Sequence, residues 1–210
     1  MIYKITIISP FTALKFNFGK KKFIENLAVV LALLYVVGAA YGKSWCWLAS
    51  IVSSALYFIL CYQTHLFLES ALQIFFIVMS VWGWAMWNKK NSNNEYNLKI
   101  TSNSVLQNSI FICALVLFSL FLGFIFSKYT SAALPFIDSP IAVFSIYATF
   151  LAAKKKLESW IYWFFINLAS IYLYFQRDLK TTSILFCVYC LMSIYGFYKW
   201  RKMYKISKHQ

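Results

Sequence analysis

The sequence has few charged residues. Asp, Glu, Lys and Arg make up 12% of its 210 residues, whereas about 25% is typical of a soluble domain. Only 6 residues are acidic and only 3 are proline, while hydrophobic residues reach 61%. So little charge cannot cover a water-facing surface, and a chain this hydrophobic does not stay disordered. The composition therefore indicates an integral membrane protein.

The motifs of common enzymes are also missing. The sequence has no Walker loop, no HExxH pair, no nucleophile elbow and no carboxylate cluster for a metal. Cys187 and Cys190 form a C-x-x-C pair, but no second cysteine pair or histidine accompanies them. All five cysteines lie in apolar stretches, where cysteine behaves as a small hydrophobic residue. We therefore expect neither an enzyme nor a bound cofactor or metal.

Lys and Arg dominate the few charges and give a net charge of +14. They occur in short clusters between apolar stretches, as at Lys20–Lys22, Lys89–Lys90 and Lys154–Lys156. This distribution is typical of loops beside membrane helices, where anionic headgroups attract basic residues. The expected partner is therefore membrane lipid and not nucleic acid. Residues 1–22 contain no clean hydrophobic region or cleavage site, so we expect no signal peptide.

Seven apolar stretches have the length of a membrane helix, about 17–25 residues. Their interiors carry almost no charge, whereas the polar segment 88–108 is rich in Asn and Ser and is typical of a loop. Because lipid-exposed backbone must satisfy its own hydrogen bonds, we expect an all-α bundle of seven transmembrane helices. The expected helices cover residues 24–41, 45–63, 68–87, 109–127, 137–153, 159–176 and 181–199.

The chain also repeats itself at an offset of 113 residues. Without gaps, Glu25 aligns with Asp138 and Trp47 with Trp160. Two three-helix repeats with the fourth helix as linker give a 3+1+3 parallel-repeat bundle, a symmetry common in secondary transporters. A scaffold with a duplicated bundle is the alternative. The predicted parts are a basic arm (1–22), repeat 1 (23–90), a polar loop with linker helix (91–135), repeat 2 (136–203) and a basic tail (204–210).

Positive charge is unequally distributed between the two sides of this predicted bundle. The side of the C-terminus receives 12 of the 20 Lys and Arg residues, and the opposite side receives 8. Positive-inside bias places the C-terminus in the cytoplasm and the N-terminus outside. The Lys20–Lys22 cluster, which would then lie outside, argues against this orientation.

Polar atoms gather on one face of the predicted helix 159–176. The residues of this face recur every three or four positions, and the repeat places a matching face on helix 45–63. Two such faces meeting across the repeat axis would form an aromatic slot with a few hydrogen-bonding groups. The two faces comprise Trp160, Trp163, Asn167, Ser170 and Tyr174, and Trp47, Ser50, Ser54, Tyr57 and Cys61.

Asn167 is the strongest candidate for a ligand contact, because an amide at mid-bilayer depth is costly without a partner or a water-filled cavity. The alternative is that it joins packed helices. Gln73, one turn into helix 68–87, has the same two interpretations. Glu25 and Asp138 enter helices 24–41 and 137–153 on the same side, where they either cap the helix or attract a cation. Trp87 is expected in an interfacial aromatic belt and Glu158 in a water-facing loop.

Few ionisable residues lie inside the predicted spans, so the usual relay for proton or sodium coupling is missing. The sequence has no nucleotide-binding motif, so ATP is not expected as the direct energy source. The residues therefore indicate a slot for a flat, cationic molecule that moves down its gradient.

These residues resemble the PnuC-type vitamin transporters, the bacterial nicotinamide riboside permeases. The resemblance covers roughly residues 23–203 and implies a seven-helix fold of 3+1+3 organisation related to the SWEET sugar transporters, assembled as a homotrimer in the bacterial inner membrane. It rests on Leu72-Gln73-Ile74-Phe75-Phe76, Trp82-Gly83-Trp84-x-x-Trp87, Asp138-Ser139 and Lys155-Lys156-Leu157-Glu158-Ser159-Trp160-x-x-Trp163-x-x-x-Asn167.

The resemblance further implies facilitated diffusion of an unphosphorylated cationic vitamin, which a cytoplasmic kinase then traps. Thiamine is the alternative substrate, and some members have Asn near Ser53-Ser54. Retention of the helix 159–176 motif favours nicotinamide riboside, whose pyridinium would stack on tryptophan with about 2 kcal/mol of cation–π energy when desolvated. The expected substrate-binding residues are Trp160, Trp163, Asn167, Gln73, Trp47, Ser54, Tyr57 and Asp138.

Overall fold

In the part of the chain that the structure describes, seven helices lie where the sequence places the seven apolar stretches. The computed structural model describes residues 18–63, 67–90, 98–129, 134–176 and 180–208. The largest differences from the predicted bounds are at the start of α1, which begins at Phe18, and at the end of α7, which continues through Lys208. The helices are α1 (Phe18–Ala40), α2 (Cys46–Gln63), α3 (Phe67–Asn88), α4 (Val105–Tyr129), α5 (Pro135–Ala153), α6 (Ser159–Gln176) and α7 (Lys180–Lys208).

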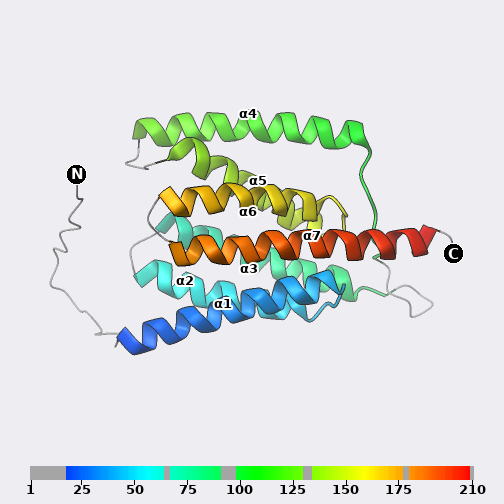
Figure 1. Cartoon of the computed structure of the whole chain (residues 1–210), viewed down its shortest axis with the longest axis horizontal. Helices are drawn as coiled ribbons and strands as arrows, with labels where there is room; N and C mark the ends of the chain where they lie inside the picture. Colours follow the sequence, from blue (N-terminus) through cyan, green and yellow to red (C-terminus); the bar gives the residue numbers. More distant parts are fainter. Residues whose placement is uncertain (1–17, 64–66, 91–97, 130–133, 177–179, 209–210) are drawn as a thin grey trace.

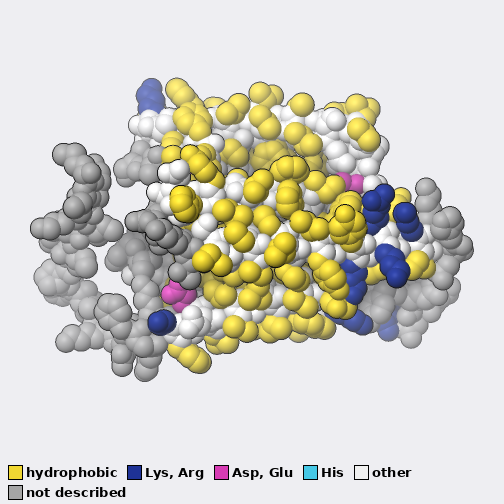
Figure 2. Space-filling view, viewed as in Figure 1, with side chains coloured by type: hydrophobic (Ala, Val, Ile, Leu, Met, Phe, Trp, Pro, Cys, Tyr) yellow, Lys and Arg dark blue, Asp and Glu magenta, His cyan; other side chains and the backbone are white. Residues whose placement is uncertain are grey.

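The helices run back and forth along the long axis, so the start of α1 and the end of α7 lie at opposite ends (Figure 1). Helices α1, α3, α5 and α7 all finish at the same end of the bundle (Figure 1). Lys and Arg side chains gather there (Figure 2). We call this part, residues 41–45, 98–104, 154–158 and 199–208, the lysine-rich end.

The outer surface of the bundle is hydrophobic, as Figure 2 shows for one face. Among the described residues, six helices are long and apolar enough to cross a membrane, and α6 is the helix that falls outside this group. Its 18 residues include Asn167 together with several Ser, Trp and Tyr residues, which lower its hydropathy. The chain is a multi-pass membrane protein.

The helices pack in a pattern that is unchanged when α1–α3 are exchanged with α5–α7. In each set the middle helix packs against the other two, α2 against α1 and α3, and α6 against α5 and α7. The two sets meet where α1 packs against α7 and where α3 packs against α5. Helix α4 lies at the edge of the bundle and packs against α5 (Figure 1). Of its 25 residues, only Ser119 and Gly123 are buried.

The turns after α1 and α5 share one backbone conformation. Gly42 and Lys155, 113 residues apart, have positive φ angles of 67° and 50°. The amide of Gly42 donates to Ala39 over 2.9 Å, and that of Lys155 donates to Ala152 over 3.0 Å. Six further backbone hydrogen bonds, which run from 41 to 37, 43 to 38, 46 to 43, 47 to 44, 48 to 45 and 49 to 45, recur at the same offset.

Candidate functional site

Four tryptophans form a row across the bundle at the lysine-rich end. The ring centroids of Trp47 and Trp87 lie 5.5 Å apart at 89°, and those of Trp87 and Trp200 lie 5.9 Å apart. The ring centroids of Trp200 and Trp160 lie 5.5 Å apart, and the two ring planes make an angle of 86°. Edge-to-face arrangements of this kind stabilise aromatic pairs beyond the area they bury. All four side chains are buried, and we call this set the tryptophan row.

The two outer tryptophans of the row, Trp47 and Trp160, each pack directly against a glycine. A Cβ built on Gly83 would lie 2.6 Å from the Trp47 ring, and one on Gly196 would lie 2.5 Å from the Trp160 ring. Real Cβ atoms do not approach a neighbour so closely. The close approach of α3 to Trp47, and of α7 to Trp160, therefore requires glycine at both positions.

Hydrogen bonds distinguish the inner from the outer members of the row. The Nε1 of Trp87 donates to the Ala153 carbonyl over 3.0 Å, and the Nε1 of Trp200 donates to the Ala39 carbonyl over 2.9 Å. The Nε1 atoms of Trp47 and Trp160 are buried without a partner among the described residues. A buried N–H without an acceptor costs about 1–3 kcal/mol, so packing holds these two indoles.

This arrangement corrects two predictions. The prediction that Trp87 lies in an interfacial belt is wrong, because its side chain is 2% exposed inside the row. The predicted direct meeting of the α2 and α6 faces is also wrong, because these helices do not pack against each other in the part that the structure describes. Trp87 and Trp200, from α3 and α7, lie between Trp47 and Trp160.

Asn167 lies about two turns along α6 from Trp160 and is buried. Its Nδ2 donates to the Ser193 Oγ of α7 over 3.2 Å, and the Ser193 hydroxyl donates to the Tyr189 carbonyl over 2.8 Å. In the first half of the chain, the hydroxyls of Ser50 and Ser80 form a comparable pair at 2.7 Å. A polar pair thus joins the second and third helix of each set.

The predicted polar face of α6 contacts two different neighbours. Trp160, Asn167 and Tyr174 contact α7, where Tyr174 stacks on Phe186 with centroids 5.1 Å apart. Trp163 is half-buried and packs against an α5–α6 cluster that includes Ala148, Leu151, Tyr162 and Ile166. The face therefore serves two interfaces.

The other predicted residues lie away from the tryptophan row. On α2, Ser54 is buried and Tyr57 is half-buried, about 10 and 15 Å of helix beyond Trp47. Gln73 is half-buried near the start of α3. Asp138 is half-buried in the first turn of α5, at the end of the bundle opposite the lysine-rich end. The predicted set therefore extends along most of the bundle.

The two acidic residues that the repeat pairs occupy different environments. Asp138 lies in the first turn of α5, where a carboxylate is favoured by the helix dipole. Helix α1 begins at Phe18, so Glu25 lies about two turns inside it and is exposed. The capping interpretation of Glu25 is therefore wrong, and that of Asp138 stays a prediction.

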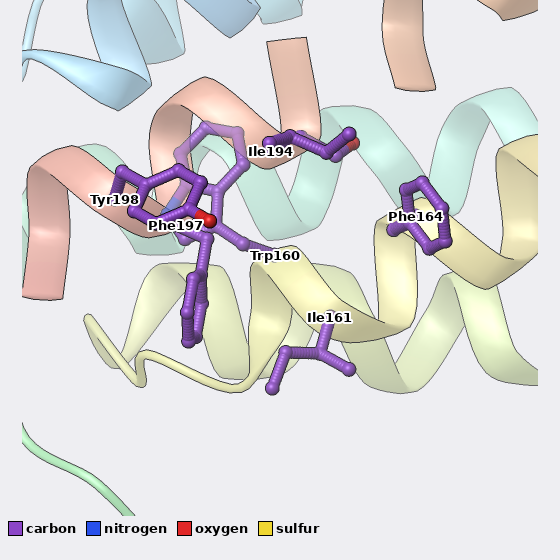
Figure 3. Close-up of a pocket in the computed structure, with 7 residues that line it drawn as sticks. Trp160, Ile161, Phe164, Ile194, Phe197 and Tyr198 are labelled. Atoms are coloured by element: carbon purple, nitrogen blue, oxygen red, sulfur yellow. The ribbon is translucent and has the colours of Figure 1, made fainter. Parts of the chain in front are cut away.

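An open groove of about 210 Å³ lies between α6 and α7 beside Trp160 and Ser193. Figure 3 shows Trp160 and Phe197 close together, with Ile161, Phe164 and Ile194 along the two helices. The groove reaches the partner of Asn167 and one edge of the tryptophan row. Sequence patterns gave no indication of Phe197 or Tyr198, because aromatic residues are so common in this chain.

Glu158 and Lys155 lie against the described segment before α4. Glu158 was expected in water but is 7% exposed, because Ser102 and Asn103 donate hydrogen bonds to its Oε1. The Lys155 Nζ lies 4.6 Å from the Trp87 ring centroid and donates to the Leu98 carbonyl over 3.3 Å. Burial lowers the pKa of the Lys155 amine.

A family model described as nicotinamide mononucleotide transporter matches residues 22–202. The chain belongs to this transporter family. It is 24% identical to the nicotinamide riboside transporter PnuC of Escherichia coli over 84% of each chain. It is 27% identical to PnuC of Neisseria mucosa, over 92% of this chain and 77% of that one. The predicted resemblance to PnuC-type transporters is confirmed.

Two further comparisons bear on fold and substrate range. The crystal structure of the vitamin B3 transporter PnuC is similar with a TM-score of 0.70 and 25% identity, covering 92% of this chain and 86% of that chain. The riboflavin/roseoflavin transporter RibM of Streptomyces davaonensis is 21% identical over 81% of each chain. The family is thus one of vitamin-type transporters, and the chain is a transporter and not an enzyme.

Proposed function

We propose that this chain is a permease for nicotinamide riboside that works by facilitated diffusion, with trapping by cytoplasmic phosphorylation. The observation that carries the proposal is the α6 motif Trp160, Trp163 and Asn167 in a chain whose relatives include two nicotinamide riboside transporters. Thiamine, which the sequence leaves open, and riboflavin, the substrate in the name of a more distant relative, are the competing vitamins.

The proposed architecture is a pair of three-helix repeats joined by α4, in a homotrimer of the bacterial inner membrane. The exchangeable packing pattern and the shared backbone of the two turns support the repeats. The proposed orientation places the lysine-rich end in the cytoplasm, supported by the Lys and Arg residues at this end. The trimer rests on the family resemblance alone.

The chemistry of the described spans suits a nucleoside better than a nucleotide. A phosphate taken out of water needs paired cations. Within the described spans, Lys and Arg lie towards helix ends, as at Lys22, Lys128 and Lys199. Trp160 and Trp163 in the first half of α6 offer indole rings for a pyridinium, and the Asn167 amide and Ser193 hydroxyl further along offer hydrogen bonds for ribose hydroxyls. The wider proposed set adds Trp47, Ser54, Tyr57, Gln73 and Asp138.

The proposal is tested by calorimetry on the purified protein with four compounds. Nicotinamide riboside should bind more tightly than nicotinamide mononucleotide, thiamine or riboflavin. Tighter binding of thiamine or riboflavin would keep the transporter and replace its substrate. Binding of none of the four would refute the proposed function.

Asn167→Leu should weaken nicotinamide riboside binding and leave the helical fold intact. A buried hydrogen bond to a neutral group contributes about 0.5–1.5 kcal/mol, and leucine suits the bilayer better than asparagine. The measurement is calorimetric affinity, with melting temperature in the same detergent. Asn26→Leu is the matched control, because it makes the same replacement at an exposed position of α1. Normal binding by Asn167→Leu would make Asn167 a packing residue.

Uptake into proteoliposomes should equilibrate without accumulation, whatever proton or sodium gradient is imposed. The reason is that the few acidic side chains in the described spans, Glu25 and Asp138, lie towards helix ends and not at the centre, where coupling ions usually bind. The measurement is internal substrate concentration at steady state. Accumulation that an ionophore collapses would contradict facilitated diffusion.

A further inference from the structure

The segment 98–104, just before α4, lies across the turn between α5 and α6. The Thr101 amide donates to the Lys155 carbonyl over 3.1 Å, and the Leu157 amide donates to the Thr101 carbonyl over 2.9 Å. These bonds form an isolated parallel bridge between Thr101 and Lys156. A segment from the middle of the chain is therefore fastened to the turn that precedes α6.

Charged side chains reinforce this attachment on both sides of the bridge. The Glu158 Oε1 accepts hydrogen bonds from the Ser102 hydroxyl over 2.5 Å and from the Asn103 amide over 2.9 Å. The Lys155 ammonium donates to the Leu98 carbonyl over 3.3 Å. Hydrogen bonds to ionised groups are roughly twice as strong as those between neutral groups. Glu158 and Lys155 therefore supply much of the attachment.

The attachment provides hydrogen bonds to only one of the two carboxylate oxygens of Glu158. Its Oε2 is buried without a partner among the described residues, as are the hydroxyls of Tyr147 and Tyr162. A carboxylate oxygen that is buried and unpaired is costly. If the segment lifts, water reaches this oxygen and offsets part of the lost hydrogen bonding. The free-energy difference between the attached and the lifted segment is therefore smaller than the number of hydrogen bonds indicates.

The segment is also part of the packing around the tryptophan row. Ile100 is buried in the same core as Trp47, Trp87, Trp160 and Trp200. Lys155 contacts the segment through Leu98 and contacts Trp87 through its ammonium. Lifting the segment removes Ile100 from this core and frees Lys155.

The corresponding turn of the first half is attached differently, because its Ser44 hydroxyl donates to the Asn88 Oδ1 at the end of α3 over 2.8 Å. The repeat places Trp45 opposite Glu158, and this side chain is 46% exposed. The backbone of the two turns is shared, but the carboxylate that receives Ser102 and Asn103 belongs to the α5–α6 turn alone. The attachment is therefore a feature added to one half of a repeated framework.

We propose that residues 98–104 are a latch that holds the lysine-rich end closed, with Glu158 as the positioning residue whose bonds to Ser102 and Asn103 set how often this end opens. The inference rests on the proposed transport function, because a permease must open this end to release its substrate. Loss of either bond shifts the latch towards the lifted arrangement.

The accessibility of the Cys46 thiol shows whether the lysine-rich end is open, and it can be measured without substrate. It is fully buried in the core that contains Ile100 and Trp47. A protein that keeps only this cysteine carries alanine at Cys61, Cys113, Cys187 and Cys190. The readout is the rate at which a membrane-impermeant maleimide labels Cys46 at constant pH, with melting temperature measured in parallel.

Ser102→Ala and Glu158→Gln should each raise the labelling rate on the order of tenfold, the equivalent of one hydrogen bond to a charged group. Ser127→Ala is the matched control, because the Ser127 hydroxyl donates to the Phe124 carbonyl at the other end of α4. Its labelling rate should equal that of the parent protein. Should Glu158→Gln fail to fold, Ser102→Ala, an exposed position, decides the question.

Unchanged labelling of folded Ser102→Ala would overturn the latch. An equal rise for the Ser127→Ala control would overturn it too, because that is loosening of the whole bundle. Faster labelling confined to the Ser102 and Glu158 variants supports the latch. Because labelling needs no substrate, absence of vitamin binding by the parent protein would refute the proposed function separately.

Discussion

Gly196→Ala is expected to lower the melting temperature and to abolish substrate binding. The new Cβ would lie 2.5 Å from the Trp160 ring, so the indole must leave its position or α7 must move away from α6. Overpacking of this kind costs about 1–3 kcal/mol or more. It also displaces one of the proposed substrate contacts. The measurements are thermal melting in detergent and calorimetric affinity for nicotinamide riboside.

Two comparison variants make this result specific. Gly83→Ala should lower the melting temperature by a similar amount, because its Cβ would lie 2.6 Å from the Trp47 ring. Gly42→Ala should have a smaller effect, about 1–2 kcal/mol, because it meets only the flexible tip of Met203 and is limited by its positive φ. Equal melting of Gly196→Ala and the parent protein would show that Trp160 does not pack on α7 as described.

Trp87→Phe is expected to destabilise the protein by about 2–4 kcal/mol. The indole contacts Trp47 and Trp200, donates to the Ala153 carbonyl and lies under the Lys155 ammonium. Phenylalanine would leave a cavity and would remove the hydrogen bond, so the buried carbonyl loses its donor. The change is measured as a lower melting temperature in the same detergent.

Trp84→Phe is the matched control for this substitution. It lies less than one turn away on α3 and is 42% exposed, so its replacement should change stability by no more than about 0.5 kcal/mol. A similar melting temperature for the two variants would contradict the central position of Trp87 in the row.

The helices were predictable from the sequence because a bilayer imposes length and apolarity on every span. All seven apolar stretches are helical in the structure. The end of α7 was not predictable in this way. Its residues after 199 include four Lys or Arg, and the helix continues because Met203 and Tyr204 pack against the core at the lysine-rich end. That packing depends on a tertiary contact that hydropathy does not register.

The candidate site was predictable only as a set of faces. Periodicity placed Trp160 and Asn167 on one side of α6, and both do contact α7. It could not show which helix a face meets, so the separation of Trp163 towards α5 was missed. Glu158 was missed because a carboxylate in a short basic turn has the composition of a solvated loop. Its partners, Ser102 and Asn103, are more than 50 residues away.

The left-handed position in the two turns has a mechanical consequence. Gly42 occupies it with little strain, whereas Lys155 occupies it at about 1–2 kcal/mol for a residue with a Cβ. The lysine is anchored to Leu98 and Trp87, so a rotation of this turn carries the end of the α3–α4 connection with it. The turn at Gly42 is tied to the end of α3 in its own half, because the Ser44 hydroxyl donates to the Asn88 Oδ1 over 2.8 Å. A rotation of the first turn is therefore coupled to α3, whereas a rotation of the second turn is coupled to the segment that leads into α4.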